Sequence, residues 1–416
     1  MKDETLRTQV VVNVGFTVIK GVSLILSIWV ADLYLTASTM GLLLLFRRQG
    51  ALWGNLLQLG FSQSLQKFYT ASADSGKRQI LWGTRNHWVL CASAAPLLFT
   101  LIFPGQLNNF LFGSIDVFPA WAFGLYVGGV SLGFMACSSW MAEFRFGYAN
   151  VVDWLNSSLI FILSILLLGK FSSEYIPVFL ASATLFASCV SLLIFKWRYI
   201  PDVSLFKNSC RLEKTVVGFG ITRSFSSFLD MGLLVVGPWM LKDLPQQAGY
   251  LLITYNVLRL AQTMIMPVAQ VLALRSNSCC HNHKEEAQGV LKLAGVSVVS
   301  AGFVVGAYYL FGKATLAIWL PNSASDVALI LDRLIPFVPA FCLFYSLRNY
   351  IDLKYLFPWN LLILAVAILG LVVTVYIFPA QDISAIIIGS QVMLSVLLLS
   401  SISFLCAIAY RLKFEK

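Results

Sequence analysis

Long apolar runs are the feature of this sequence that most constrains its fold. Twelve stretches are long enough to cross a bilayer, whose hydrocarbon core of about 30 Å takes roughly 20 residues of helix. The chain is 58% hydrophobic and only 12% charged, whereas about half of a soluble domain is apolar. The sequence therefore predicts an all-α, polytopic membrane protein. The expected spans are 10–34, 39–60, 79–103, 117–140, 151–169, 176–195, 215–241, 248–274, 288–311, 328–349, 357–378 and 384–410.

The placement of lysine and arginine predicts how these spans are oriented. Eighteen basic residues lie at the two termini and in alternate loops, whereas the opposite loops carry only Lys170, Lys242 and Lys313. Basic loops stay in the cytoplasm, so we expect both termini there. The same bias and anionic lipid headgroups account for the net charge of +10 without a nucleic-acid partner. The first apolar run has no small-residue cleavage site of the kind that ends a signal peptide, so we expect it to remain as a helix.

Five basic residues lie deep within the expected spans. A cation near the middle of a bilayer costs at least about 2.5–3.5 kcal/mol, so each one needs a reason. They fall on the first, second, seventh and eighth spans and are Lys20, Arg47, Arg48, Arg223 and Arg259.

Polar residues accompany these cations at helical spacing. A polar stripe in lipid must face protein or water, so stripes on four spans predict a shared hydrated cavity. Five deep cations against one deep carboxylate, Asp230, leave that cavity positive, and a positive cavity favours an anion. The polar residues assigned to it are Asn13, Thr17, Asn55, Gln58, Asp230 and Gln262.

Two details of this cavity follow from helix geometry. Asp230 lies one to two turns from Arg223, which makes an internal ion pair the structural alternative for that arginine. Arg47 and Arg48 diverge by about 100° and cannot point along one radius. Arg48 continues the stripe towards Asn55 and Gln58, so we expect Arg48 to face the cavity and Arg47 to face a neighbouring helix.

A weak internal repeat indicates two six-helix halves. "VVNVGFT" (11–17) opens the first span and "VVGFGIT" (216–222) opens the seventh, a separation close to half the chain. We therefore expect an N-terminal lobe over 1–200 and a C-terminal lobe over 201–416.

Three stretches resemble the Wzx-type polysaccharide flippases of the MOP superfamily, which move lipid-linked oligosaccharides such as O-antigen units. They are "GNLLQLGFSQSLQKFYTAS" (54–72), "QTMIMPVAQVLALRS" (262–276) and "LAIWLPNSASDVALILDRLIP" (316–336). The resemblance implies two six-helix lobes around a central cavity in a bacterial inner membrane, alternating between inward-open and outward-open states. It also implies a cargo, an undecaprenyl-diphosphate-linked oligosaccharide carried from the cytoplasmic to the periplasmic leaflet. A polysaccharide polymerase and a chain-length regulator are the protein partners it suggests.

The resemblance also implies that basic residues on the first, second, seventh and eighth helices engage the diphosphate. Lys20, Arg47, Arg48, Arg223 and Arg259 match by helix and depth. Their chemistry agrees, because arginine gives a phosphate bidentate donors and lysine gives it a point charge.

Three rival functions stay open at this stage. A cation-coupled multidrug antiporter of the MATE type would share the fold, but that class tends to place carboxylates in the first-lobe cavity, where this chain has Lys20 and Arg48. A polysaccharide polymerase typically needs one large outer loop, whereas the outer loops here have about 16 residues or fewer. A non-transporting scaffold in a glycan-synthesis complex is the third.

No motif predicts an enzyme, a cofactor or a metal site. "SNSCCHNH" (276–283) matches no standard zinc spacing, and its adjacent cysteines are poor geometry for one tetrahedral ion. No general-base constellation appears in any loop. Eight cysteines lie in expected spans or cytoplasmic loops, so we expect no structural disulfide.

Overall fold

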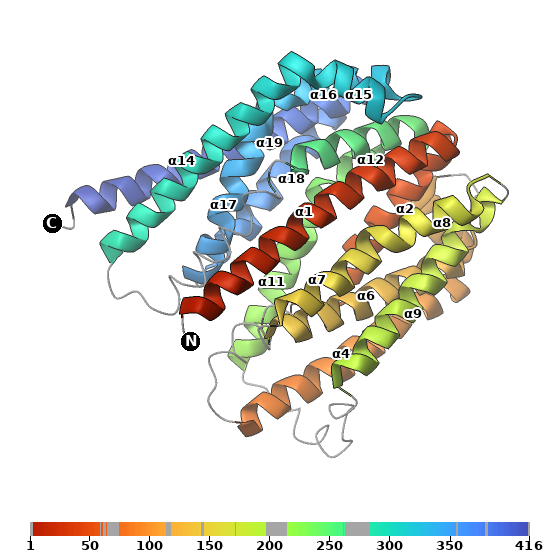
Figure 1. Ribbon diagram of the computed structural model, residues 1–416, viewed down its shortest axis with the longest axis horizontal. Coiled ribbons are helices and arrows are strands. Elements are labelled where there is room, and N and C mark those ends of the chain that lie inside the picture. The colour runs from red at the N-terminus through yellow and green to blue at the C-terminus, as the bar shows by residue number, and fades with distance from the viewer. Residues whose placement is uncertain are drawn as a thin grey trace. The chain divides into compact units, whose positions relative to one another are not determined.

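The computed structural model consists of helices and their connections, as the apolar runs predict (Figure 1). It describes residues 3–58, 60, 64, 75–113, 118–142, 145–170, 172–196, 214–260, 262, 283–354, 357–378 and 382–414. The α-helices are α1 (Asp3–Tyr34), α2 (Ala37–Leu56), α4 (Ser75–Ile102), α5 (Pro104–Phe112), α6 (Ala120–Ala142), α7 (Phe146–Trp154), α8 (Ile160–Leu168), α9 (Ile176–Lys196), α11 (Lys214–Leu233), α12 (Val236–Met240), α14 (His283–Ala307), α15 (Lys313–Trp319), α16 (Ala324–Leu334), α17 (Val338–Lys354), α18 (Trp359–Ile377) and α19 (Ile383–Phe414). Residues 245–260 form a further helix.

Short helical segments of other types join some of these helices. Two are π-helical turns, η2 (Leu155–Leu159) and η5 (Tyr308–Gly312), and two are 3-10 turns, η3 (Ser173–Tyr175) and η6 (Ile335–Phe337). Because η2 connects α7 to α8, the fifth expected span is one helix with a π-helical turn near its middle.

Eight helices in the described part of the chain are long and apolar enough to span a membrane. A ninth span is added if α4 and α5 count together, although the chain bends by 103° between them. These nine correspond to the first, third to sixth and ninth to twelfth expected spans. The protein is therefore an all-α, multi-pass membrane protein.

The three other expected spans are the second, seventh and eighth, represented by α2, α11 and 245–260. They carry Arg47, Arg48, Arg223 and Arg259. Of these helices, α2 and α11 are not apolar enough to count among the eight, and only 16 residues of the third belong to the described part of the chain.

The described contacts divide the chain into two compact units. Unit 1 comprises Met1–Gly21, Val236–Leu241 and Gln247–Lys416, and unit 2 comprises Val22–Val235 and Lys242–Gln246. The division passes through α1 and assigns α11 to unit 2, so it does not coincide with the expected boundary at 200. The two six-helix lobes stay a prediction.

Unit 2 is organised around α6, which packs against α2, α4, α7 and α9 (Figure 1). Small residues allow this close packing, as they do in other membrane bundles. A Cβ atom on Gly129 would lie 2.8 Å from the backbone nitrogen of Leu185 in α9. A Cβ atom on Gly124 would lie 2.7 Å from the carbonyl oxygen of Pro96 in α4. Both neighbouring backbones therefore approach α6 at glycines.

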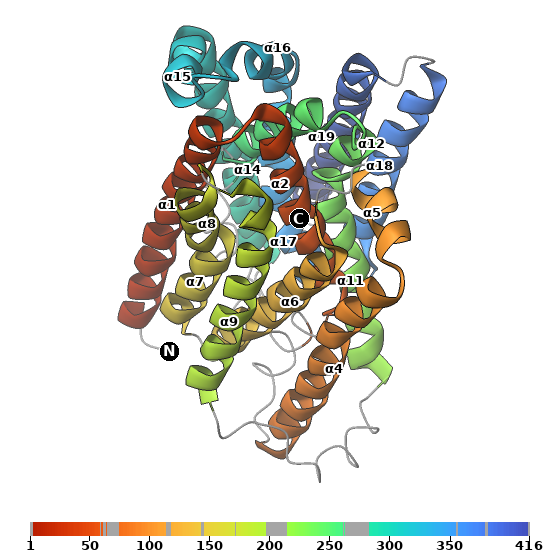
Figure 2. The same cartoon turned by 90° about the vertical axis from the view of Figure 1, so that its right-hand side faces the viewer.

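The sharp bend between α4 and α5 leaves α5 running in a different direction from α4 (Figure 2). Proline at the first position of α5 suits a helix start, because its missing N–H needs no partner there. The other end of α5 is capped by Lys242, whose Nζ donates to the carbonyl oxygens of Asn109 at 2.9 Å and Phe110 at 3.2 Å.

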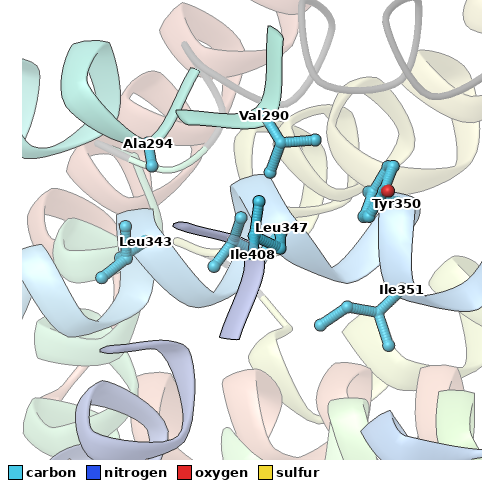
Figure 3. Packing of buried hydrophobic residues seen from close by; sticks show 7 residues of the cluster. All are labelled: Val290, Ala294, Leu343, Leu347, Tyr350, Ile351 and Ile408. Atoms are coloured by element: carbon cyan, nitrogen blue, oxygen red, sulfur yellow. The ribbon is translucent and has the colours of Figure 1, made fainter. Parts of the chain in front are cut away.

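Unit 1 has its own core, in which α14, α17 and α19 meet. Figure 3 shows Val290 and Ala294 of α14 above Leu343 and Leu347 of α17, with Ile408 of α19 beside them. All five side chains are apolar and buried.

One end of unit 1 carries an ion pair that concerns the tenth span. Asp332 accepts a hydrogen bond from Tyr308 at 2.7 Å and lies 3.3 Å from the Nζ of Lys313. Arg333, the next residue, is exposed. Asp332 therefore has local partners and Arg333 is exposed, so neither charge needs the predicted cationic cavity to account for it.

Candidate functional site

Arg47 faces a neighbouring helix, as expected for one member of the arginine pair. Its Nη2 donates to the carbonyl oxygen of Ser157 in η2, and its guanidinium carbon lies 4.2 Å from the centre of the Phe161 ring. Tyr126 of α6 lies beside the same side chain. Arg47 therefore joins α2 to the fifth span inside unit 2.

Arg48 points to a different side of α2. Phe46, Gly50, Gly54 and Gln58 recur every four residues and face α6, with the ring of Phe46 5.1 Å from that of Tyr126 and Gly50 against the same ring. At about 100° per residue, Arg48 lies on the side of the helix roughly opposite this row.

Asn55 lies two turns beyond Arg48 on the same side, and both residues are half-exposed. Arg48 and Asn55 therefore share one face of α2, whereas Gln58, the third member of the predicted stripe, packs on α6.

The second and seventh spans, both predicted to carry cavity cations, are direct neighbours in unit 2. The hydroxyl of Ser224 donates to the carbonyl oxygen of Leu56 at 3.3 Å, and the rings of Trp53 and Phe228 lie 6.0 Å apart. Farther along, Gly60 has φ +68° and meets the backbone of Gly220, where any side chain would collide with the carbonyl group. The three contacts follow opposite sequence orders in the two spans, so the second and seventh spans lie antiparallel.

Arg223 of α11 is buried, with 4% of its surface exposed. Its guanidinium carbon lies 5.2 Å from the centre of the Phe219 ring, one turn towards the start of α11. Asp230 lies seven residues in the other direction, which is about 10 Å along the helix. The pairing of Arg223 with Asp230, the structural alternative for this arginine, stays a prediction.

Lys20 and Arg259 belong to unit 1, and their helices touch close to both cations. A Cβ atom on Gly21 would lie 3.5 Å from Cδ2 of Leu260. Each of these residues directly follows a cation, so α1 and 245–260 are neighbours at the level of Lys20 and Arg259. Both cations are half-exposed.

The other predicted cavity residues occupy varied surroundings. Gln58 is buried and its Nε2 donates to the carbonyl oxygen of Ser131 at 2.6 Å and to its hydroxyl at 2.9 Å, which makes it a packing contact with α6. Thr17 is half-exposed and Gln262 is buried. The side chain of Asn13 lies outside the described part of the structure. That the four striped helices share one cavity stays a prediction.

The π-helical turn η2 is a cluster of hydrogen-bonding residues that the sequence did not predict. Trp154, just before η2, donates from Nε1 to the hydroxyl of Ser23 in α1 at 2.8 Å. Asn156 donates from Nδ2 to the hydroxyl of Ser188 in α9 at 3.2 Å. With the bond from Arg47, the segment 154–157 is hydrogen-bonded to α1, α2 and α9. The one signal in the sequence is the polar run "NSS" (156–158) within an apolar span.

No group of three or more His, Cys, Asp or Glu side chains that could hold a metal ion occurs among the described residues. Most of the Cys- and His-containing segment 276–283 lies outside those residues.

Comparisons with known proteins identify the fold. No protein-family model and no curated protein sequence matches this chain. Among solved structures, a MATE in complex with MaL6 matches with a TM-score of 0.67 at 13% identity, over 99% of this chain and 100% of that one. The chain has a MATE-like fold. A MATE in the bent conformation gives a TM-score of 0.65 at 14% identity, over 98% of this chain and 97% of the other.

A third structure with the MATE-like fold is described as an outward-facing multidrug resistance transporter of the MOP superfamily. It matches with a TM-score of 0.62 at 15% identity, over 97% of both chains. At such low identity the agreement shows the fold alone, and the match extends along nearly the whole chain. The MATE-like fold expected from the sequence is confirmed.

Proposed function

We propose that this protein is a flippase that moves an undecaprenyl-diphosphate-linked oligosaccharide from the cytoplasmic to the periplasmic leaflet. The two halves alternate between inward-open and outward-open states, and basic residues between them engage the diphosphate. The protein catalyses no covalent step. Both termini face the cytoplasm of a bacterial cell whose inner membrane holds the protein.

The observation that carries this proposal is the position of the cations. Lys20, Arg48 and Arg223 lie in the interiors of helices, and Arg259 lies near the end of the described helix 245–260. All four belong to expected membrane spans, where a charge without a function would be costly. Arginine offers paired donors that match a phosphate oxygen pair, and the two phosphates need several such donors once they leave water.

Membrane voltage favours the proposed direction of transport. A diphosphate carries about two negative charges, and moving them out of a negative cytoplasm releases up to about 4.6 kcal/mol at 100 mV. The voltage therefore supplies part of the driving force. The positive site has a different task, which is to neutralise the charge of the diphosphate during passage.

The alternative is a cation-coupled multidrug antiporter, and two observations favour it. The similar structures include a multidrug resistance transporter of the MATE family. In addition, Asp32 of α1 is buried, with 2% of its surface exposed, and a buried carboxylate on a membrane helix suits cation or proton binding. The four cations named above oppose this alternative, because they would repel cationic drugs.

Deletion of the gene separates the two functions. A flippase deletion should remove surface polysaccharide and leave lipid-linked oligosaccharide in the cytoplasmic leaflet, detected by extraction and by its protection from periplasmic enzymes. Efflux of a cationic dye such as ethidium should stay at the wild-type rate. Normal surface polysaccharide together with slowed dye efflux would instead establish the antiporter.

A further inference from the structure

We infer that Arg47 is a positioning residue, which holds α2 on the π-helical turn η2 so that Arg48 is presented to the cargo. This inference rests on the proposed function for its cargo, but its structural part does not. It gives the two adjacent arginines different tasks, although the family resemblance implies that both engage the diphosphate.

The contacts of Arg47 are directional and lie inside unit 2. Its guanidinium donates to a backbone carbonyl of η2, lies over the ring of Phe161 and has Tyr126 beside it. Phe161 has no exposed surface, so the ring beneath the guanidinium is itself fixed by packing. A planar guanidinium held at three sides leaves its backbone little freedom to rotate or slide.

The contacts of Arg47 also restrict the backbone of Arg48. Arg48 is the next residue of the same uninterrupted helix, so its Cα position and its direction are set by the anchor of Arg47. A displacement of α2 by about 1 Å is enough to weaken a bidentate contact with phosphate oxygens, and misplacements of that size reduce rates by up to about a hundredfold in enzymes.

The same π-helical turn also holds α1, which carries Lys20. Trp154 donates to Ser23 at 2.8 Å, and Ser23 lies one turn after Lys20. Segment 154–157 thus restrains two helices that each carry a deep cation. π-Helical turns are rare and frequently occur at functional sites, because they present carbonyl groups away from the ordinary helical ladder.

Polar anchoring of this kind suits a lobe that moves as a unit. Hydrogen bonds between membrane helices fix the register of neighbours that dispersion forces alone leave free to slide. Arg47 and Trp154 would therefore keep the arrangement of α1, α2 and the fifth span constant while the lobe changes its tilt.

The first experiment measures transport normalised to protein abundance in the full-length chain. Arg47→Met should lower transport by about tenfold or more, and Arg47→Lys should keep part of the activity because it retains a donor for the Ser157 carbonyl. Arg145→Met is the matched control: Arg145 is exposed and lies 5.7 Å from the Trp140 ring, in the same unit but away from η2. This control should transport normally.

A second background tests whether Arg47 acts through Arg48. In Arg48→Lys protein the flexible lysine depends less on the placement of α2, so Arg47→Met should reduce transport by a smaller factor there than in the wild type. An equal factor in both backgrounds would indicate a general structural effect and would overturn the inference.

A distance measurement decides the structural part without any cargo. Spin labels at Ser38→Cys in α2 and Val151→Cys in α7, both exposed positions of unit 2, are placed in an otherwise cysteine-free protein in lipid nanodiscs. Arg47→Met should broaden or shift the distance distribution, and Arg145→Met should leave it unchanged. Unchanged distances in Arg47→Met would overturn the anchor. Failure of the wild type to move lipid-linked oligosaccharide would overturn the proposed function, and the distances would still test the anchor.

Discussion

At the residue scale, one helical step separates two arginines with different surroundings. Arg47 contacts the Ser157 carbonyl and the ring of Phe161, and Tyr126 lies beside it. Arg48 belongs to the side of α2 roughly opposite the row that packs on α6. Both side chains are half-exposed. Charge alone does not distinguish them in the sequence, since both are arginines within one apolar run.

The proposed contact of Arg48 and Arg259 with the diphosphate predicts a specific loss. Arg48→Ala and Arg259→Ala should insert and accumulate normally yet lose surface polysaccharide, with lipid-linked precursor retained in the cytoplasmic leaflet. Lysine at either position should restore part of the transport, because the charge survives and the bidentate geometry does not. Wild-type transport per molecule in both alanine variants would contradict the cationic mechanism.

The spacing of Arg223 and Asp230 along α11 predicts that the two charges pair. Asp230→Asn should then be rescued in part by Arg223→Gln, because both charges are removed together. Effects on transport that simply add in the double variant would instead assign the two residues separate roles.

At the scale of elements, helix contacts in unit 2 depend on glycine. The backbones of α4 and α9 approach α6 where it has no side chain, and α2 and α11 meet at Gly60 and Gly220. Such contacts bring polar backbone groups of neighbouring helices close together and leave no room for even one methyl group.

Gly129→Leu should therefore separate α6 from α9. We expect a loss of at least about 1–3 kcal/mol of stability, the usual range for overpacking, since the neighbouring atoms are backbone atoms of Leu185 that cannot move alone. Gly295→Leu is the control, because a Cβ atom at Gly295 in α14 meets nothing within 4 Å. Thermal unfolding in detergent measures both, and equal midpoints would contradict the packing argument.

At the scale of the whole molecule, the sequence predicted the helices better than their irregularities. Apolar runs located the spans because each one must cross hydrocarbon, and the charges placed Lys20 and Arg259 on helices that prove to be neighbours. The π-helical turn at 155–159 was missed, since its hydrogen-bond register depends on packing and leaves composition almost unchanged. The partner of Arg47 was missed for a related reason, because a backbone carbonyl has no residue signature.

The charge bias predicts which side of the membrane each loop faces. In otherwise cysteine-free protein, Cys210 and Cys279 should resist an impermeant thiol reagent in intact cells and react once the inner membrane is opened. Both residues lie outside the described part of the structure, so the expectation rests on sequence. Asp243→Cys, an exposed position next to Lys242 in an expected outer loop, should react in intact cells. The reverse pattern would invert the topology.

The weak apolarity of α2 has a consequence for biosynthesis. Two adjacent arginines near the middle of α2 oppose its partition from the translocon into lipid by about 5–7 kcal/mol if their individual penalties add. The contacts that offset the share of Arg47 come from Ser157 and Phe161, which are synthesised about a hundred residues later. We therefore expect stable insertion of the second span to depend on the fifth, so that assembly of the lobe becomes a condition for inserting one of its own helices.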